Sequence, residues 1–151
     1  MTRLTSWLLA ALICTLSLPA AAADALGSRE DLLQQTGVFM DSVASGDIQA
    51  AYRHLRPHLG VDSQPYDQSA KDAVGYFSQV SDQAGKTLDT SQVRTEVIAN
   101  DFTRISWLQK FRSAAIAWEF TFYRPDADGW KLVGVSYSTD IEYLYRDQPI
   151  R

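Results

Sequence analysis

Cysteine and histidine, the side chains that most often hold metals or attack substrates, are nearly missing from this 151-residue chain. Its single cysteine, Cys14, lies inside an apolar run near the amino end, and its two histidines are His54 and His58. Pro57 stands between the histidines and is expected to end their helix, so their spacing does not predict a metal site. We therefore expect both histidines on the surface, and no metal, disulfide or thiol nucleophile in the mature protein.

Basic runs are also missing. The chain has 14 lysines and arginines against 18 acidic residues, and the two signs are interspersed. Because nucleic-acid binding depends on neutralising phosphates, the sequence predicts no nucleic-acid partner. It also has no glycine-rich turn that joins a strand to a helix and could hold a phosphate. We expect no cofactor.

The amino end has the three parts of a secretory signal. Arg3 is the only charge before Asp24, an apolar run follows over residues 7–18, and residues 20–23 are four alanines. This run is shorter than the roughly 20 apolar residues that a membrane-spanning helix needs. The pattern is typical of a cleavable signal peptide, and the alternatives are an uncleaved membrane anchor or a buried helix.

Cleavage is expected after Ala23 or one residue earlier. Residues 1–23 then form the signal peptide, and residues 24–151 form a single α+β domain without a membrane anchor, located in the periplasm or secreted. Cys14 is not expected to carry a lipid, because the large residue Ile13 precedes it where lipoprotein processing needs a small one.

The first half of the mature chain has helical periodicity. Ser28 is the expected N-cap of the first helix, Gly46 its stop, and Asp47 the cap of the second. A third helix is predicted over residues 66–84, with Gly85 as its stop. Its expected apolar stripe is Ala70, Ala73, Val74, Phe77, Ser81 and Ala84.

After Gly85 the apolar period changes to two. Four strands are predicted, over residues 93–99, 102–110, 114–123 and 130–137, followed by a short terminal helix capped around Thr139. The connections are too short for crossovers, so the strands must pair as an antiparallel meander. Helices followed by strands predict an α+β fold.

The third predicted strand has one aromatic face. Trp118, Phe120 and Phe122 alternate with Glu119 and Thr121, so the three aromatic rings share one side of the sheet. The apolar stripes of the helices are the available cover for that side. We therefore expect the aromatic face to pack against the helices and Glu119 to point away from them.

Three pieces of the chain carry a family resemblance. They are a helix that ends in the corner Gly46-Asp47 with Tyr52 in the next helix, the strand over residues 118–123, and the returning strand over residues 129–134. In this pattern the chain resembles the nuclear transport factor 2-like superfamily over nearly all of its mature length. The resemblance implies a cone-shaped fold, with amino-terminal helices packed on a curved antiparallel sheet. It implies no single function, because this fold hosts enzymes, binders and assembly domains.

The resemblance also suggests where a ligand would bind. Enzymes of the superfamily project a carboxylate or histidine into the cone, whereas the face expected there in this chain is aromatic. We therefore predict no catalytic residue, and we name as candidate pocket residues Tyr52, Trp107, Trp118 and Phe120.

The sequence leaves more than one function open. The favoured interpretation is non-catalytic binding of a small apolar ligand or a partner protein. The alternative is an isomerase, lyase or hydrolase with its active site in the cone. A homodimer through the outer sheet face, which carries Glu119, Thr121 and Tyr123, is compatible with the binding interpretation.

Overall fold

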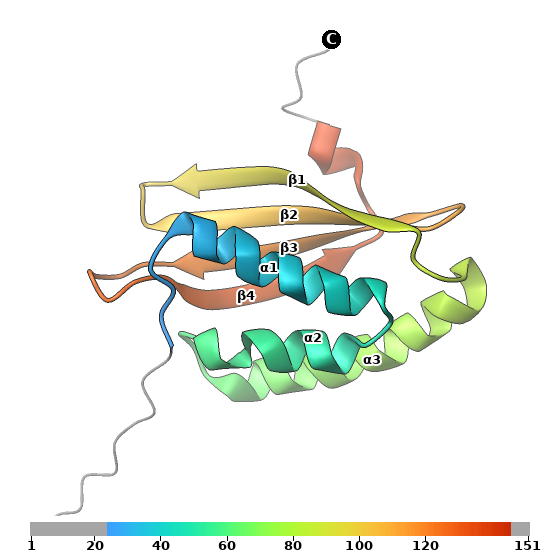
Figure 1. Cartoon of the computed structure of the whole chain (residues 1–151), viewed down its shortest axis with the longest axis horizontal. Coiled ribbons are helices and arrows are strands. Elements are labelled where there is room, and N and C mark those ends of the chain that lie inside the picture. Colours follow the sequence, from blue (N-terminus) through green and yellow to red (C-terminus); the bar gives the residue numbers. More distant parts are fainter. Residues whose placement is uncertain (1–23, 146–151) are drawn as a thin grey trace, which may run out of the picture.

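Helices precede strands in the computed structural model, which describes residues 24–145 (Figure 1). The helices are α1 (Arg29–Ala44), α2 (Ile48–Leu55) and α3 (Ser63–Ala84), with 3₁₀ turns η1 (Arg56–His58) and η2 (Glu142–Tyr145). The strands are β1 (Asp89–Ile98), β2 (Phe102–Lys110), β3 (Ala115–Tyr123) and β4 (Lys131–Ser138). The predicted α+β class is confirmed. The predicted signal peptide lies outside the described residues.

Both ends of α1 form as the sequence predicts. The Ser28 hydroxyl accepts a hydrogen bond from the Asp31 backbone N–H at 3.1 Å, and the Asp31 carboxylate accepts one from the Ser28 N–H at 2.9 Å. This reciprocal capping box fixes the start of α1. At the other end Gly46 has a φ of 85°, and the Asp47 carboxylate caps α2 by accepting from the Ala50 N–H at 2.8 Å.

Helix α3 begins three residues earlier than predicted. Its cap is Asp62, whose carboxylate accepts from the Gln64 N–H at 2.9 Å. Pro65 lies in the first turn of α3, where its missing N–H breaks no helical hydrogen bond.

The predicted stripe of α3 is wrong at Val74, which is 43% exposed, and at Ser81, which is also exposed. The residues of α3 that are buried are Tyr66, Ala73 and Phe77. Val74 follows Ala73 by one position, which turns its side chain by about 100° around the helix axis and away from the sheet.

The four strands form one antiparallel sheet in the order β1-β2-β3-β4, so the predicted meander is confirmed. The limits of β2 are as predicted, but β1 begins at Asp89, four residues before the predicted start. Its first residues are polar, and a register shift between Gln92 and Arg94 interrupts the alternation. Pairing with β2, rather than an apolar pattern, makes this segment a strand.

The aromatic face of β3 packs against the helices. Trp118, Phe120 and Phe122 are fully buried, and the ring centre of Phe39 on α1 lies 5.3 Å from that of Trp118. From α3, Phe77 stacks on Trp118 at 4.9 Å. The predicted face assignment is confirmed.

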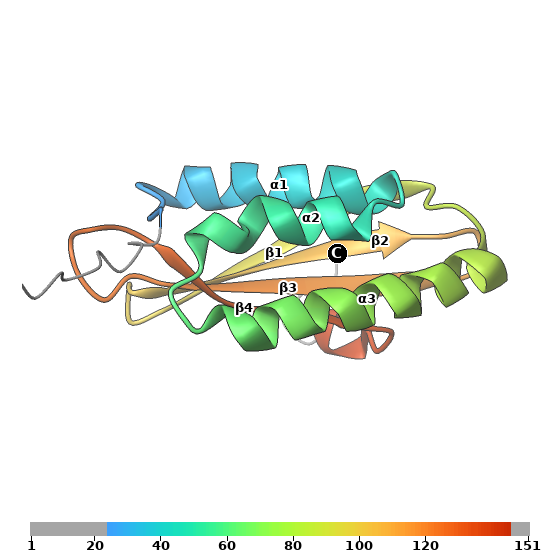
Figure 2. The same ribbon diagram turned by 90° about the horizontal axis from the view of Figure 1, so that it is seen from below.

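The opposite face of the sheet is partly covered by η2, and Figure 2 shows α1 and η2 on opposite sides of the strands. Arg94 donates to the carbonyl of Leu144 at 2.6 Å. Burial, and then the charge of the neighbouring Glu119, raises the pKa of the Tyr143 hydroxyl to about 12. A homodimer through this face stays a prediction.

Candidate functional site

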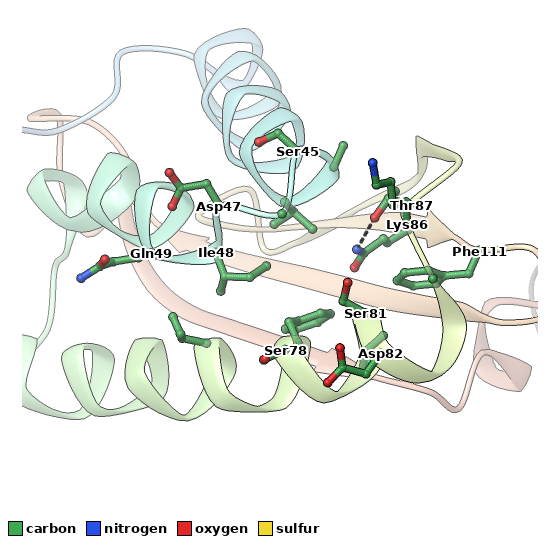
Figure 3. Close-up of a pocket in the computed structure, with 18 residues that line it drawn as sticks. Ser45, Asp47, Ile48, Gln49, Ser78, Ser81, Asp82, Lys86, Thr87 and Phe111 are labelled. Atoms are coloured by element: carbon green, nitrogen blue, oxygen red, sulfur yellow. Dashed lines mark hydrogen bonds between the residues drawn. The ribbon is translucent and has the colours of Figure 1, made fainter.

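A cavity of 710 Å³ opens at the corner where α1 ends and α2 begins, facing the second half of α3 (Figure 3). Its apolar wall includes Val43, Ile48, Phe77 and Phe111. Its polar groups include Ser45, Asp47, Ser81, Asp82, Lys86, Thr87 and Gln109. The cavity thus combines an apolar lining with polar groups from several elements.

Two glycines shape the walls of this cavity. Gly46 and Gly85 have φ values of 85° and 79°, a region that favours glycine, and each ends a helix. The first turns the chain from α1 into α2, and the second turns it from α3 toward β1. The loop after Gly85 carries Lys86 and Thr87 along the cavity.

Gln109 is the most buried polar side chain of the cavity, at 2% exposure. Its side-chain oxygen accepts a hydrogen bond from the indole N–H of Trp118 at 3.0 Å. Its nitrogen donates to the Thr87 hydroxyl at 2.8 Å, the bond dashed in Figure 3. Gln109 was not among the candidate residues predicted from the sequence. The available signal was a polar side chain two positions after Trp107, on the core-facing side of β2.

The cavity has little of the chemistry that proton transfer needs. The Asp47 carboxylate is engaged as the cap of α2, and Asp82 and Lys86 are exposed. Among the described residues that line the cavity, none is a histidine or a cysteine. The wall therefore offers hydrogen bonds and apolar contacts.

The four predicted pocket residues lie elsewhere, in or beside the core. The ring of Phe39 contacts Tyr52, Trp118 and Phe120, with centre distances of 5.3, 5.3 and 5.0 Å. Trp107 is half-buried and donates from its indole N–H to the Thr36 hydroxyl at 3.2 Å. Phe39 therefore fills the space that these aromatic residues surround, and none of the four lines the cavity at the helix corner.

Tyr52 does line a second cavity, of 580 Å³, between α2 and α3. There the Tyr66 hydroxyl donates to the Tyr52 carbonyl at 2.8 Å, and burial raises the pKa of both hydroxyls well above the usual range. At the rim, Arg56 binds Asp67 through two hydrogen bonds of 2.8 and 2.9 Å and lowers the pKa of that carboxyl. Arg56 and Asp67 are both exposed, so this ion pair lies at the solvent side of the second cavity.

The histidines are less exposed than predicted. Pro57 ends α2, but the chain continues into η1, and both His54 and His58 are half-buried. The Nε2 atom of His54 is buried and has no hydrogen-bond partner among residues 24–145. Burial, followed by the charge of His58, lowers the pKa of His54. Within the same residues, no group of three potential metal ligands comes together.

Comparison with known proteins gives a likeness at the level of fold. No family model matches the chain, and no curated protein matches it. Among solved structures, the chain is similar to a Campylobacter jejuni protein provisionally named an NTF2-like transpeptidase. The match has 14% identity and a TM-score of 0.47 and covers 71% of this chain and 99% of that one. The likeness is one of fold. Nothing about family membership or chemistry follows from it.

None of the helices described is long and apolar enough to cross a membrane.

Proposed function

We propose that this protein is an exported, non-catalytic binding protein that holds a small, largely apolar molecule in the cavity at the α1–α2 corner. The observation that carries the proposal is the cavity itself. Its 710 Å³ lies within the roughly 300–1,000 Å³ typical of small-molecule sites. Its mixed lining, with Phe77 and Phe111 beside a buried Gln109, can supply both apolar contacts and hydrogen bonds to a ligand.

The lining supports binding more than catalysis. General acid–base catalysis needs a titratable group held within hydrogen-bond distance of a reacting atom. Of the acids here, Asp47 is occupied as a helix cap and Asp82 is exposed to water, which weakens both as positioned catalysts. A concave cavity also favours a small molecule over a protein partner, which would need a broader surface.

Export is part of the proposal and rests on the sequence alone. The charge of Arg3, the apolar run over residues 7–18 and the alanines at 20–23 support a cleaved signal. The ligand would then be a molecule of the periplasm or of the medium.

A cavity-filling variant tests the site. The uncharged apolar fluorescent probe N-phenyl-1-naphthylamine should bind the purified mature protein saturably and with one-to-one stoichiometry. Ser81→Trp, which places an indole on the wall of the cavity, should abolish that binding. Gln83→Trp is the matched control, because Gln83 is also exposed on α3 but lines neither cavity.

Circular dichroism and thermal unfolding of both variants show that the fold is kept. If the probe does not bind, or if both tryptophan variants bind it as the parent does, the cavity is not the binding site.

A further inference from the structure

Gln109 has one hydrogen-bond donor more than the protein uses. A glutamine amide carries two N–H donors and one acceptor oxygen. In this structure the oxygen is paired with Trp118 and one N–H with Thr87. Within the described part of the chain, no partner is seen for the second N–H, although the residue is 2% exposed.

The two partners also fix the orientation of the amide. The indole nitrogen of Trp118 is a donor only, so it must face the oxygen of Gln109 and not its NH₂ group. A flipped amide would place two donors against each other. The NH₂ group is therefore held on the side of Thr87, which lines the cavity together with Gln109.

We propose that this second N–H is the recognition group of the cavity, and that the ligand is an uncharged molecule with a carbonyl at its buried end and an apolar body. Ketones, esters and amides have this chemistry. The inference rests on the proposed function, because it names the class of molecule that the same cavity holds.

The charges around the cavity favour a neutral carbonyl over a carboxylate. Burying a carboxylate needs a paired cation. Lys86, the one cationic residue among the described residues of the lining, is exposed. Asp47 and Asp82 add negative charge to the same lining. A neutral carbonyl oxygen can accept the hydrogen bond from the Gln109 amide and needs no paired cation.

A hydrocarbon of the same shape should bind more weakly. It would displace water from the cavity and leave the N–H of Gln109 buried without a partner, a state that proteins strongly disfavour. Sites built to hydrogen-bond a ligand reject the analogue that lacks the polar group for this reason. We expect a preference of about tenfold for the carbonyl compound.

Benzophenone and diphenylmethane provide the matched pair, because they differ only in a carbonyl against a methylene. Their dissociation constants for the mature protein can be measured by NMR titration of backbone amides at pH 8. The parent should bind benzophenone about tenfold more tightly. Gln109→Glu, which keeps an acceptor for Trp118 but has no N–H, should bind the two equally.

Two further variants complete the design. Gln109→Met removes the donor without adding charge and should also lose the preference. It serves as a second test because the buried charge of Gln109→Glu could destabilise the fold. Gln92→Glu is the control, because Gln92 is exposed on β1, and it should keep the preference.

The outcomes separate the two claims. If the parent binds both compounds equally and Ser81→Trp blocks both, the cavity binds ligands but Gln109 does not select them, and this inference is overturned alone. If the parent prefers benzophenone and the Gln109 variants keep that preference, a group other than Gln109 recognises the carbonyl and the inference is again wrong. If neither compound binds, the proposed function fails as well.

Discussion

The ring of Phe39 meets the ring of Phe120 edge to face, with centres 5.0 Å apart and planes inclined at 78°. Both side chains are fully buried. This contact joins α1 to the middle of β3 and fills the interior in which the sequence placed a ligand. The interior is therefore packed at this contact, whereas a cavity opens at the helix corner.

Phe120→Ala should lower the free energy of unfolding by about 3–5 kcal/mol, because it empties a packed aromatic site. That is a large share of the roughly 5–15 kcal/mol typical of a domain. Thr121→Ala should cost much less, because Thr121 is half-buried on the other face of β3. Urea denaturation of both variants measures the difference, and equal losses would contradict the face assignment.

Trp118→Phe should lower the free energy of unfolding by more than the loss of packing around a smaller ring accounts for. The change leaves the side-chain oxygen of Gln109 buried without its donor, which adds about 1–3 kcal/mol to the packing loss. A double-mutant cycle with Gln109→Leu isolates the pair. The double variant should lose about 1 kcal/mol less than the sum of the single variants. Strict additivity would show that the hydrogen bond contributes nothing.

His54 should make the protein less stable in mild acid. Its folded-state pKa lies below the ordinary value of 6.5, so the unfolded chain binds the proton more tightly. The stabilising contribution is therefore present above pH 6.5 and is lost as the pH falls through the lowered folded-state pKa. Urea denaturation at several pH values should show this decline, and His54→Gln should flatten it.

The histidine resonances test the cause. Burial is the larger influence on His54 and the charge of His58 the smaller, so His58→Gln should raise the pKa of His54 only in part. An NMR titration in which the parent His54 ionises at or above 6.5 would contradict the assignment.

Export should produce a mature chain that begins at Asp24 or within a residue or two of it. The chain is expressed with residues 1–151 in a bacterial host, and the intact mass of the protein in the periplasmic fraction is measured. Arg3→Glu should slow this export, because the positive start of the signal is reversed. A full-length cytoplasmic product that retains Met1 would refute the prediction.

The sequence by itself determined the order of the elements and most of their ends. Ser28, Gly46, Asp47 and Gly85 begin or end helices as predicted, because capping depends on backbone groups within a few residues of the cap. The aromatic face of the strand that carries Phe120 was also predictable, because side chains of a strand alternate whatever lies on either side.

Only the tertiary structure decided where space remains inside the molecule. The sequence shows that Phe39 and Phe120 are apolar, but not that their rings meet and close the interior of the cone. The hydrogen bonds of Gln109 are made with Thr87 and Trp118, which lie 22 and 9 positions away along the chain. Such contacts depend on how the helices and the sheet dock, and no local pattern contains that information. The cavity at the helix corner is therefore a product of packing.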